Sequence, residues 1–241
     1  MIAEVRAVLW KEWRELLRAG PGCERGSLTF GIGVLFLGAW SAGVIIRHPF
    51  GSGWQAGLLC AAMAALTAAS VAGDSFAGER ERRTLETLLA SCLSDREVYL
   101  GKIAAVVSYG AATSLLFVIS GMVASRIIHG STGPLLPLLA GLGLSFLTAA
   151  LVAGIGVLMS LTASTVRQAQ QMLMLSLTGL GVVPYVVLRF LPAAWKASAA
   201  GWIATMGSEI VLALAVVLAL LGAGALWLGA ARFRRERLIL S

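Results

Sequence analysis

The sequence predicts an all-α polytopic membrane protein, and three features support this fold class. Hydrophobic residues make up 58% of the 241 positions and charged residues only 13%, whereas soluble domains carry about 25% charged residues. Apolar runs of ~20 residues, long enough to cross a bilayer, recur along the chain. The 28 glycines are the third feature, because membrane helices use small residues to pack closely.

One transmembrane domain over residues 1–241 is predicted, because six spans of ~20 residues use most of the chain. Residues 1–26 form an amphipathic segment ahead of the first span, and residues 74–97 form a charged elbow between the second and third. The predicted spans are residues 28–46, 54–73, 98–124, 135–161, 172–191 and 210–231. Glycines in the fourth and sixth spans are expected to allow close packing. They are Gly141, Gly143, Gly154, Gly156, Gly222, Gly224 and Gly229.

The distribution of lysine and arginine predicts the orientation of the chain. With the N-terminus in the cytoplasm, 15 of the 19 basic residues fall in cytoplasmic segments and 4 fall outside. This asymmetry follows the positive-inside rule, and an odd number of spans would remove it. Both termini are therefore predicted to be cytoplasmic, in a multi-pass protein of the cell's inner (cytoplasmic) membrane. The formal charge of +7 is attributed to topology, and nucleic-acid binding is not expected.

The N-terminal segment is predicted to be an amphipathic helix. Its apolar residues recur every three or four positions, which is the period of one helix face. They are Ile2, Val5, Leu9, Trp13 and Leu16. Charged residues occupy most other positions, so the helix is expected to lie in the plane of the lipid headgroups. Its centre is Lys11, Glu12, Trp13, Arg14 and Glu15.

The charged elbow allows two interpretations. From Thr84 onward, Leu85, Leu88 and Leu89 form one narrow apolar stripe, which indicates a short surface helix. The same residues also fit a solvated loop whose charges keep it out of the bilayer. The residues themselves favour neither interpretation.

The third span is expected to start at a defined cap. Ser94 and Glu97 have the spacing of a capping box, in which each side chain binds the other residue's amide. Gly101 and Lys102 follow about one turn further into the span. Lys102 is expected to extend its ammonium group to the membrane interface.

Residues 79–102 carry a recognisable succession of motifs. Residues 79–89 read ERERRTLETLL, followed by Ser94-Asp-Arg-Glu97 and then by Gly101-Lys102. This succession resembles the signature of type 2 ABC (ABC-2) export permeases, which is roughly E-x-E-x-G-T-L-E-x-L-L, a proline-containing turn, a capped helix start and G-K. The chain departs from it at Arg83, where glycine is usual, and at residues 91–93, which lack the proline. Span number, orientation and the N-terminal helix extend the resemblance to nearly the whole chain.

The resemblance implies a transport function and a set of partners. The chain would be the permease subunit of an ATP-driven exporter, assembled with a second permease copy and two separate ABC ATPase subunits. The elbow would dock on the ATPase and transmit its closure to the membrane helices, while the N-terminal helix would help to frame it. The coupling residues implied are Glu79, Glu81, Thr84, Leu85, Glu86, Leu88 and Leu89. ATP and Mg would be bound by the partner, and this chain would bind no cofactor.

Nucleotide-binding and catalytic motifs are missing from the sequence. There is no G-x-x-x-x-G-K-[ST], so any ATP dependence is expected to come from another chain. There is no H-E-x-x-H, and His48 and His129 stand alone in predicted external loops. No catalytic residue and no metal site are therefore expected.

Two other classes of membrane protein remain as alternatives. A membrane-embedded lipid-modifying enzyme needs several polar residues at one bilayer depth, and a secondary carrier usually places ionisable groups within its spans. Of the 12 acidic residues, 11 fall on the predicted cytoplasmic side, which favours neither class. Glu209 is the exception and opens the sixth span. Stabilisation of the helix N-terminus explains its position, and a role in the substrate path is the alternative.

Overall fold

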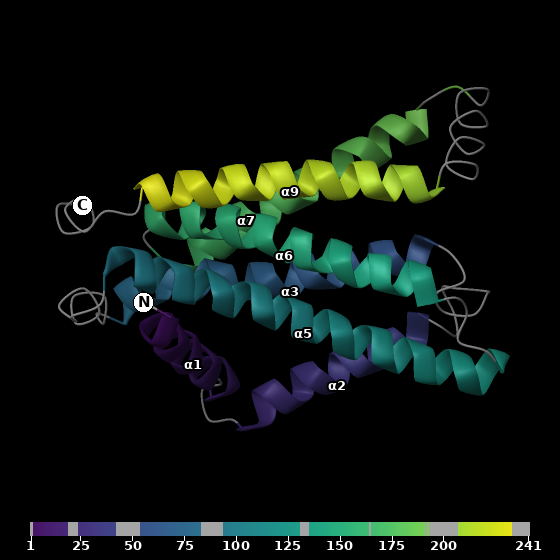
Figure 1. Ribbon diagram of the computed structural model, residues 1–241, viewed down its shortest axis with the longest axis horizontal. Coiled ribbons are helices and arrows are strands. Elements are labelled where there is room, and N and C mark those ends of the chain that lie inside the picture. The colour runs from purple at the N-terminus through teal and green to yellow at the C-terminus, as the bar shows by residue number, and fades with distance from the viewer. Residues whose placement is uncertain are drawn as a thin grey trace.

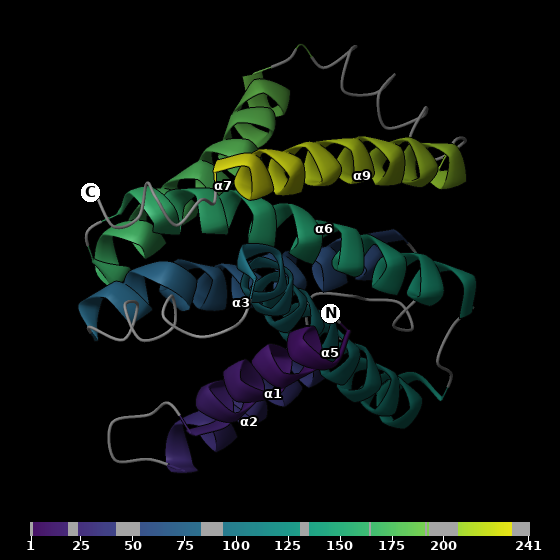
Figure 2. The same cartoon turned by 60° about the vertical axis from the view of Figure 1, so that its left-hand side comes forward.

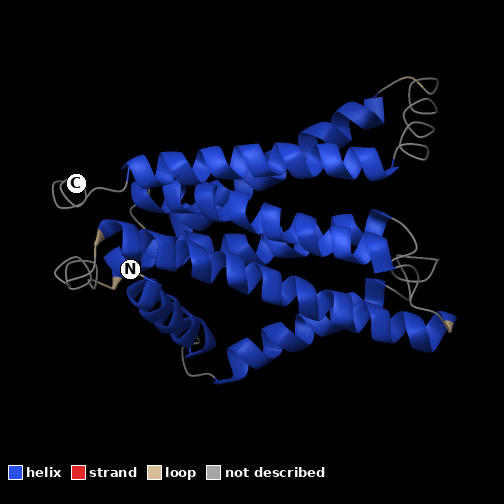
Figure 3. Cartoon of the chain, in the orientation of Figure 1, coloured by secondary structure: helices blue, strands red, loops and turns tan. Residues whose placement is uncertain are grey.

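The computed structural model describes the chain as a bundle of α-helices. The described residues are 2–18, 24–41, 54–82, 94–130, 135–163, 165–190, 192 and 207–232. Within them the structure has seven α-helices and no β-strand (Figure 3). The helices are α1 (Ile2–Arg18), α2 (Glu24–Trp40), α3 (Trp54–Glu81), α5 (Asp95–His129), α6 (Leu135–Thr162), α7 (Val166–Phe190) and α9 (Gly207–Arg232). The predicted all-α class is confirmed.

Four of these helices are long and apolar enough to cross a membrane. Their candidate spans are Ala56–Glu79 in α3, Asp95–His129 in α5, Leu138–Thr162 in α6 and Val211–Arg232 in α9. They overlap the second, third, fourth and sixth predicted spans, so the multi-pass membrane class is confirmed. The first and fifth predicted spans fall on α2 and α7, whose described residues do not meet the same criteria. A total of six spans stays a prediction.

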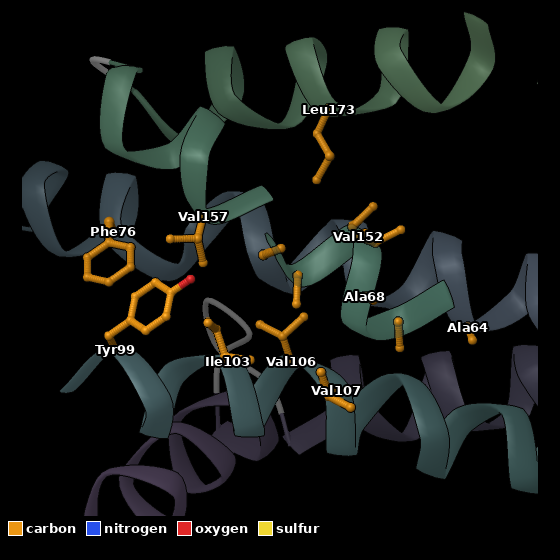
Figure 4. Close-up of a cluster of buried hydrophobic side chains, with 14 of the residues drawn as sticks. Ala64, Ala68, Phe76, Tyr99, Ile103, Val106, Val107, Val152, Val157 and Leu173 are labelled. Carbon is orange, nitrogen blue, oxygen red and sulfur yellow. The ribbon is translucent and has the colours of Figure 1, made fainter. Parts of the chain in front are cut away.

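Helix α3 is at the centre of the bundle. It packs against α5, α6 and α7, and α6 packs in turn against α9 (Figure 1). The main hydrophobic core lies between these helices (Figure 4). In it, the side chains of Phe76 from α3, Tyr99 from α5 and Val157 from α6 lie close together. Because Phe76 is near the end of α3 and Tyr99 near the start of α5, the core fixes these two segments relative to each other.

Small residues allow close approach of the helices, as the sequence predicts. A Cβ placed on Gly141 of α6 would lie 2.6 Å from the Cα of Gly57 in α3. The predicted packing residues Gly154, Gly156 and Gly229 are also within 3 Å of a neighbouring helix by this measure. For Gly143 and Gly224, no atom in the described part of the chain lies within 4 Å of an added Cβ. Close packing therefore does not explain these two glycines.

Helix α5 begins where the sequence predicts. Ser94 Oγ accepts the amide of Glu97 at 3.4 Å, and the Glu97 carboxylate accepts the amide of Ser94 at 2.8 Å, so the capping box is confirmed. The helix ends at Gly130, whose φ of 73° suits glycine. Its 35 residues make it about 52 Å long. It is thus longer than the ~30 Å hydrocarbon core of a bilayer.

Helix α3 is longer than the predicted second span. The prediction ended the span at Gly73, before the charges of the elbow, whereas the helix continues to Glu81. Its last turns are held by packing, because Ala77 forms a small buried cluster with Ala163 and Ala169. Residues 74–81 of the predicted elbow therefore belong to α3, and residues 83–93 lie outside the described part of the chain.

One end of the bundle gathers the segments that the motifs single out. The start of α1, the last turn of α3, the first turns of α5 and the end of α9 lie together at the left of Figure 1. The start of α7 also lies there, bonded to the end of α3. We call this the elbow end of the bundle, because residues 83–93 follow directly from it.

Candidate functional site

Helix α1 packs on α5 at the elbow end (Figure 2). The two helices approach closely at Gly101, where an added Cβ would lie 2.6 Å from the Cβ of Val8. Trp13 donates its indole N–H to Ser108 Oγ at 2.8 Å. Its ring also meets Tyr109 edge-on, with 6.0 Å between centroids. One face of α1 is therefore held by the protein itself.

Lys102 of α5 is buried, with 1% of its surface exposed. Its ammonium group donates to Glu12 Oε1 of α1 at 2.8 Å and to the carbonyl oxygen of Ser75 in α3 at 2.7 Å. The same nitrogen lies 3.5 Å from Glu79 Oε1 and 5.3 Å from the centre of the Phe76 ring. The expectation that Lys102 extends to the membrane interface is therefore wrong. Its charge has acceptors inside the protein, which a buried charge requires.

Glu79, near the end of α3, belongs to the same cluster and is 5% exposed. Its Oε1 accepts a hydrogen bond from Lys11 of α1 at 2.8 Å. Because Lys11 and Glu12 are adjacent on α1, the pairs close a ring of alternating charges: Lys11, Glu79, Lys102 and Glu12. We call these residues the four-charge cluster. It joins α1, α3 and α5.

The environment of Lys11 favours its charged form. Partial burial alone would lower the pKa of Lys11, but the hydrogen bond to Glu79 and the charges of Glu79, Glu12 and Glu15 together outweigh it. The pKa is raised as a result. The Lys11–Glu15 pair itself, 3.3 Å apart with both side chains 42% exposed, contributes little to stability.

Three carboxylates lie in or beside the cluster, and all three pair with its two lysines. Oxygens of Glu12, Glu15 and Glu79 lie within 4.8 Å of one another, a spacing that also suits a metal ion. Each has a lysine partner: Glu12 pairs with Lys102, Glu15 with Lys11, and Glu79 with both. We therefore describe an ion-pair cluster and assign no metal to it.

Glu81 connects the end of α3 to the start of α7. Its carboxylate accepts the amide N–H of Val166, the first residue of α7, at 3.2 Å. A negative charge is favourable there, because the first amides of a helix have no partner within it. Arg82 and Asp74 form a separate pair at 2.9 Å on a more exposed side of α3. The two glutamates of the E-x-E motif thus connect the end of α3 to three other helices, α1, α5 and α7.

A family model supplies the decisive comparison. The model of the ABC-2 type transporter matches residues 3–182, well over half of the chain. The chain belongs to the ABC-2 type transporter family. It is accordingly a transport permease of a membrane, and the resemblance drawn from residues 79–102 is confirmed. No curated protein matches the chain.

The coupling residues expected of an ABC-2 permease are only partly described. Thr84, Leu85, Glu86, Leu88 and Leu89 lie outside the described residues. Glu79 is inside the four-charge cluster, and Glu81 is on the surface against α7. The role of all seven residues in coupling stays a prediction.

The central residues of α1 divide between two environments in this ABC-2 permease. Lys11, Glu12 and Trp13 contact α3 and α5. Arg14 is exposed, and Glu15 is partly exposed beside Lys11. The position of α1 in the headgroup plane stays a prediction.

Glu209 lies in the first turn of α9 and is exposed. This position fits stabilisation of the helix N-terminus by a negative charge. Its proposed role in the substrate path stays a prediction.

Sequence reasoning did not identify Lys102 as a site residue of the ABC-2 permease, nor Val8 as a contact. A usable signal was present in the Gly101-Lys102 pair. A glycine within a membrane helix often marks a close approach. A cation inside a span requires a partner within the protein. Together they indicate a charged element packed on α5, which is α1.

Proposed function

We propose that this ABC-2 permease is the membrane subunit of an ATP-driven exporter, and that a separate ATPase chain supplies the energy. The observation that carries the proposal is the family match over residues 3–182. The 241 residues contain no P-loop motif, which supports placing ATP and Mg on a partner.

The elbow end of the bundle is the surface that we assign to the ATPase. Residues 83–93 follow α3 in the sequence, and the start of α1 lies at the same end of the bundle as the last turn of α3 (Figure 1). Leu85, Leu88 and Leu89 would fill an apolar groove on the partner, while Glu86 would pair with basic residues at the rim of that groove. Two ATPases would serve two permeases, with the translocation path between the permeases.

We also propose that the permease has six spans in the inner membrane, with both termini in the cytoplasm. The start of α1 and the end of α9 lie at the same end of the bundle in Figure 1, as an even number of spans requires. The outer side of α9 supports a lipid or permease neighbour, because Leu212, Leu220 and Trp227 are each about 70% exposed.

The proposal is tested by mild solubilisation of the tagged chain from its native membrane. We expect an ABC ATPase to co-purify, and the permease freed of that partner to hydrolyse no ATP. Leu88→Asp should abolish co-purification, because a carboxylate cannot enter an apolar groove without a large desolvation penalty. Charge reversal at Glu81 and Glu86 should weaken it.

The control is Arg126→Gln, which changes one exposed charge at the opposite end of α5. It should leave the amount of bound ATPase unchanged. ATP hydrolysis by the purified chain alone, or ATPase recovery that Leu88→Asp does not alter, would contradict the proposal.

The alternative functions are less favoured. Family membership points to transport, which a lipid-modifying enzyme would not perform. Many of the buried polar side chains in the described part of the bundle are serines and threonines bonded to carbonyls of their own helix, such as Ser75 and Ser145. These hydroxyl groups are occupied by contacts within their own helices. Few buried polar side chains therefore remain for the ion relay of a secondary carrier.

A further inference from the structure

The four-charge cluster includes Glu79, which is four residues before the predicted docking segment (residues 83–93), and Lys102, which is near the start of α5. We propose that it positions the elbow, so that α1, the end of α3 and the start of α5 move as one body. The inference rests on the proposed function. It assigns Glu79 and Lys102 as positioning residues for coupling, and it removes Glu79 from the docking surface.

Lys102 is the residue on which the cluster depends. An ammonium group has three N–H donors. Two bond Glu12 Oε1 and the Ser75 carbonyl oxygen, and the nitrogen also lies 3.5 Å from Glu79 Oε1. With 1% of its surface exposed, Lys102 has no water to replace a lost partner. Separation of α1 from α5 therefore removes the Glu12 partner of a buried charge, and separation of α3 removes its Ser75 and Glu79 partners.

Lys11 and Glu12 fix the position of α1 along its own axis. They are consecutive residues of opposite charge, and Lys11 faces Glu79 while Glu12 faces Lys102. A shift of α1 by one residue in one direction would bring Lys11 toward Lys102, and a shift in the other direction would bring Glu12 toward Glu79. Like charges would then face each other in a buried site, so the alternating order selects one register.

The neutral contacts of α1 support the same register. The close approach of Val8 to Gly101 and the bond from Trp13 to Ser108 lie on either side of the charged pairs along α5. A movement of α1 therefore cannot occur without a movement of α5, or the loss of all these contacts together.

The cluster is also close in sequence to the predicted docking segment of the elbow, residues 83–93. Glu79 is four residues before Arg83, where the segment with the predicted docking leucines begins. Glu81 holds the same turn of α3 to the start of α7. A force applied to residues 83–93 thus acts first on a turn that is bound to α1, α5 and α7.

The first test needs no ATPase. Hydrogen exchange is measured by mass spectrometry on the full chain in lipid nanodiscs, for Lys102→Met and for Glu79→Gln. We expect exchange in α1 and in the last turns of α3 to rise together by about a hundredfold, the result of breaking buried ion pairs by removing one partner. Exchange in α6 and α9 should not change. Glu15→Gln is the matched control, because it removes only the exposed partner of Lys11, and its effect should stay within about twofold.

A second variant covers the case in which Lys102→Met does not fold. Glu12→Gln with Lys102→Met removes one charge of each sign and leaves Lys11 paired with Glu79. It should insert normally and still release α1 from α5, with faster exchange in α1. Exchange in α1 at the unaltered rate in this double variant would overturn the proposal.

The third measurement separates positioning from docking. In the permease–ATPase complex, exchange at the first turns of α5 is compared before and after ATP with orthovanadate is added. We expect the nucleotide-dependent change to be lost in Glu79→Gln while the ATPase still co-purifies. An unaltered response in Glu79→Gln overturns the positioning role. If no ATPase co-purifies with the unaltered chain, the proposed function fails, and the exchange data on α1 still report on the cluster.

Discussion

The hydroxyl oxygen of Ser160 in α6 lies 2.8 Å from the amide nitrogen of Ala77 in α3 and accepts its hydrogen bond. It also accepts the amide of Phe76 at 3.0 Å and donates to the carbonyl oxygen of Gly73 at 3.3 Å. The hydroxyl is therefore inserted against the backbone of α3, where it bonds two amides and one carbonyl oxygen. Glu79 is two residues after Ala77, so this insertion lies in the last turns of the candidate span of α3, next to the four-charge cluster.

Ser160→Ala should destabilise the protein. The substitution leaves two buried amides of α3 without the hydroxyl acceptor, at a cost of about 1–3 kcal/mol in the free energy of unfolding. Denaturant unfolding in detergent measures this change. Ser176→Ala is the matched control, because the Ser176 hydroxyl donates only to the Met172 carbonyl oxygen of its own helix at 2.8 Å. Equal losses for the two variants would show that the insertion contributes nothing.

Gly141 and Gly143 should respond to alanine with opposite sign. An alanine in a helix is favoured over glycine by about 1 kcal/mol, so Gly143→Ala, with open space around the new Cβ, should raise the melting temperature. Gly141→Ala places its Cβ 2.6 Å from the backbone of Gly57, which no rotamer change can relieve. It should lower the melting temperature through a strain of about 1–3 kcal/mol. A rise for both variants would contradict the close packing of α3 and α6.

The start of α5 and the presence of an N-terminal helix could be predicted because their signals are local, although α1 ends at Arg18 and the predicted segment runs to residue 26. The Ser94–Glu97 capping box is contained in four consecutive residues, and helix α1 follows from the period of its apolar residues. The end of α3 could not be predicted in the same way. Charges were taken to end the helix at Gly73, whereas packing of Ala77 against Ala163 and Ala169 extends it.

The charged contacts of the site were missed for a related reason. The charged positions of α1 predict a helix in the plane of the lipid headgroups, whereas Glu12 points toward a buried lysine 90 positions away. Lys11 and Glu79 are separated by 68 positions. Hydrophobic periodicity records which side chains avoid water, and it carries no information about charges that are buried in pairs.

The outer side of α1 should bind anionic lipid. Arg6, Trp10 and Arg14 are spaced four residues apart and are exposed, Trp10 by 70%. Basic residues at a membrane surface contribute about 1 kcal/mol each to binding of anionic lipid. Native mass spectrometry of Arg6→Gln with Arg14→Gln should show a loss of retained phosphatidylglycerol, by about fivefold in affinity for each arginine. Retention of phosphatidylcholine should not change, and Arg126→Gln serves as the control for net charge. Unaltered phosphatidylglycerol binding would place this side of α1 away from the headgroups.

The contribution of Lys11 to stability should be lost only in strong alkali. Its pKa is raised above the usual 10.5, because the hydrogen bond and charge of Glu79, with Glu12 and Glu15, outweigh the opposing effect of burial. A raised pKa in the folded state gives stability that is fully present below the unfolded pKa and is lost as the pH rises through the folded one. The difference in melting temperature between the unaltered chain and Lys11→Met should therefore be constant from about pH 7 to about pH 9. It should shrink only above pH 10.5. A difference that shrinks between neutral pH and about pH 9 would mean that the ammonium of Lys11 is not held by Glu79.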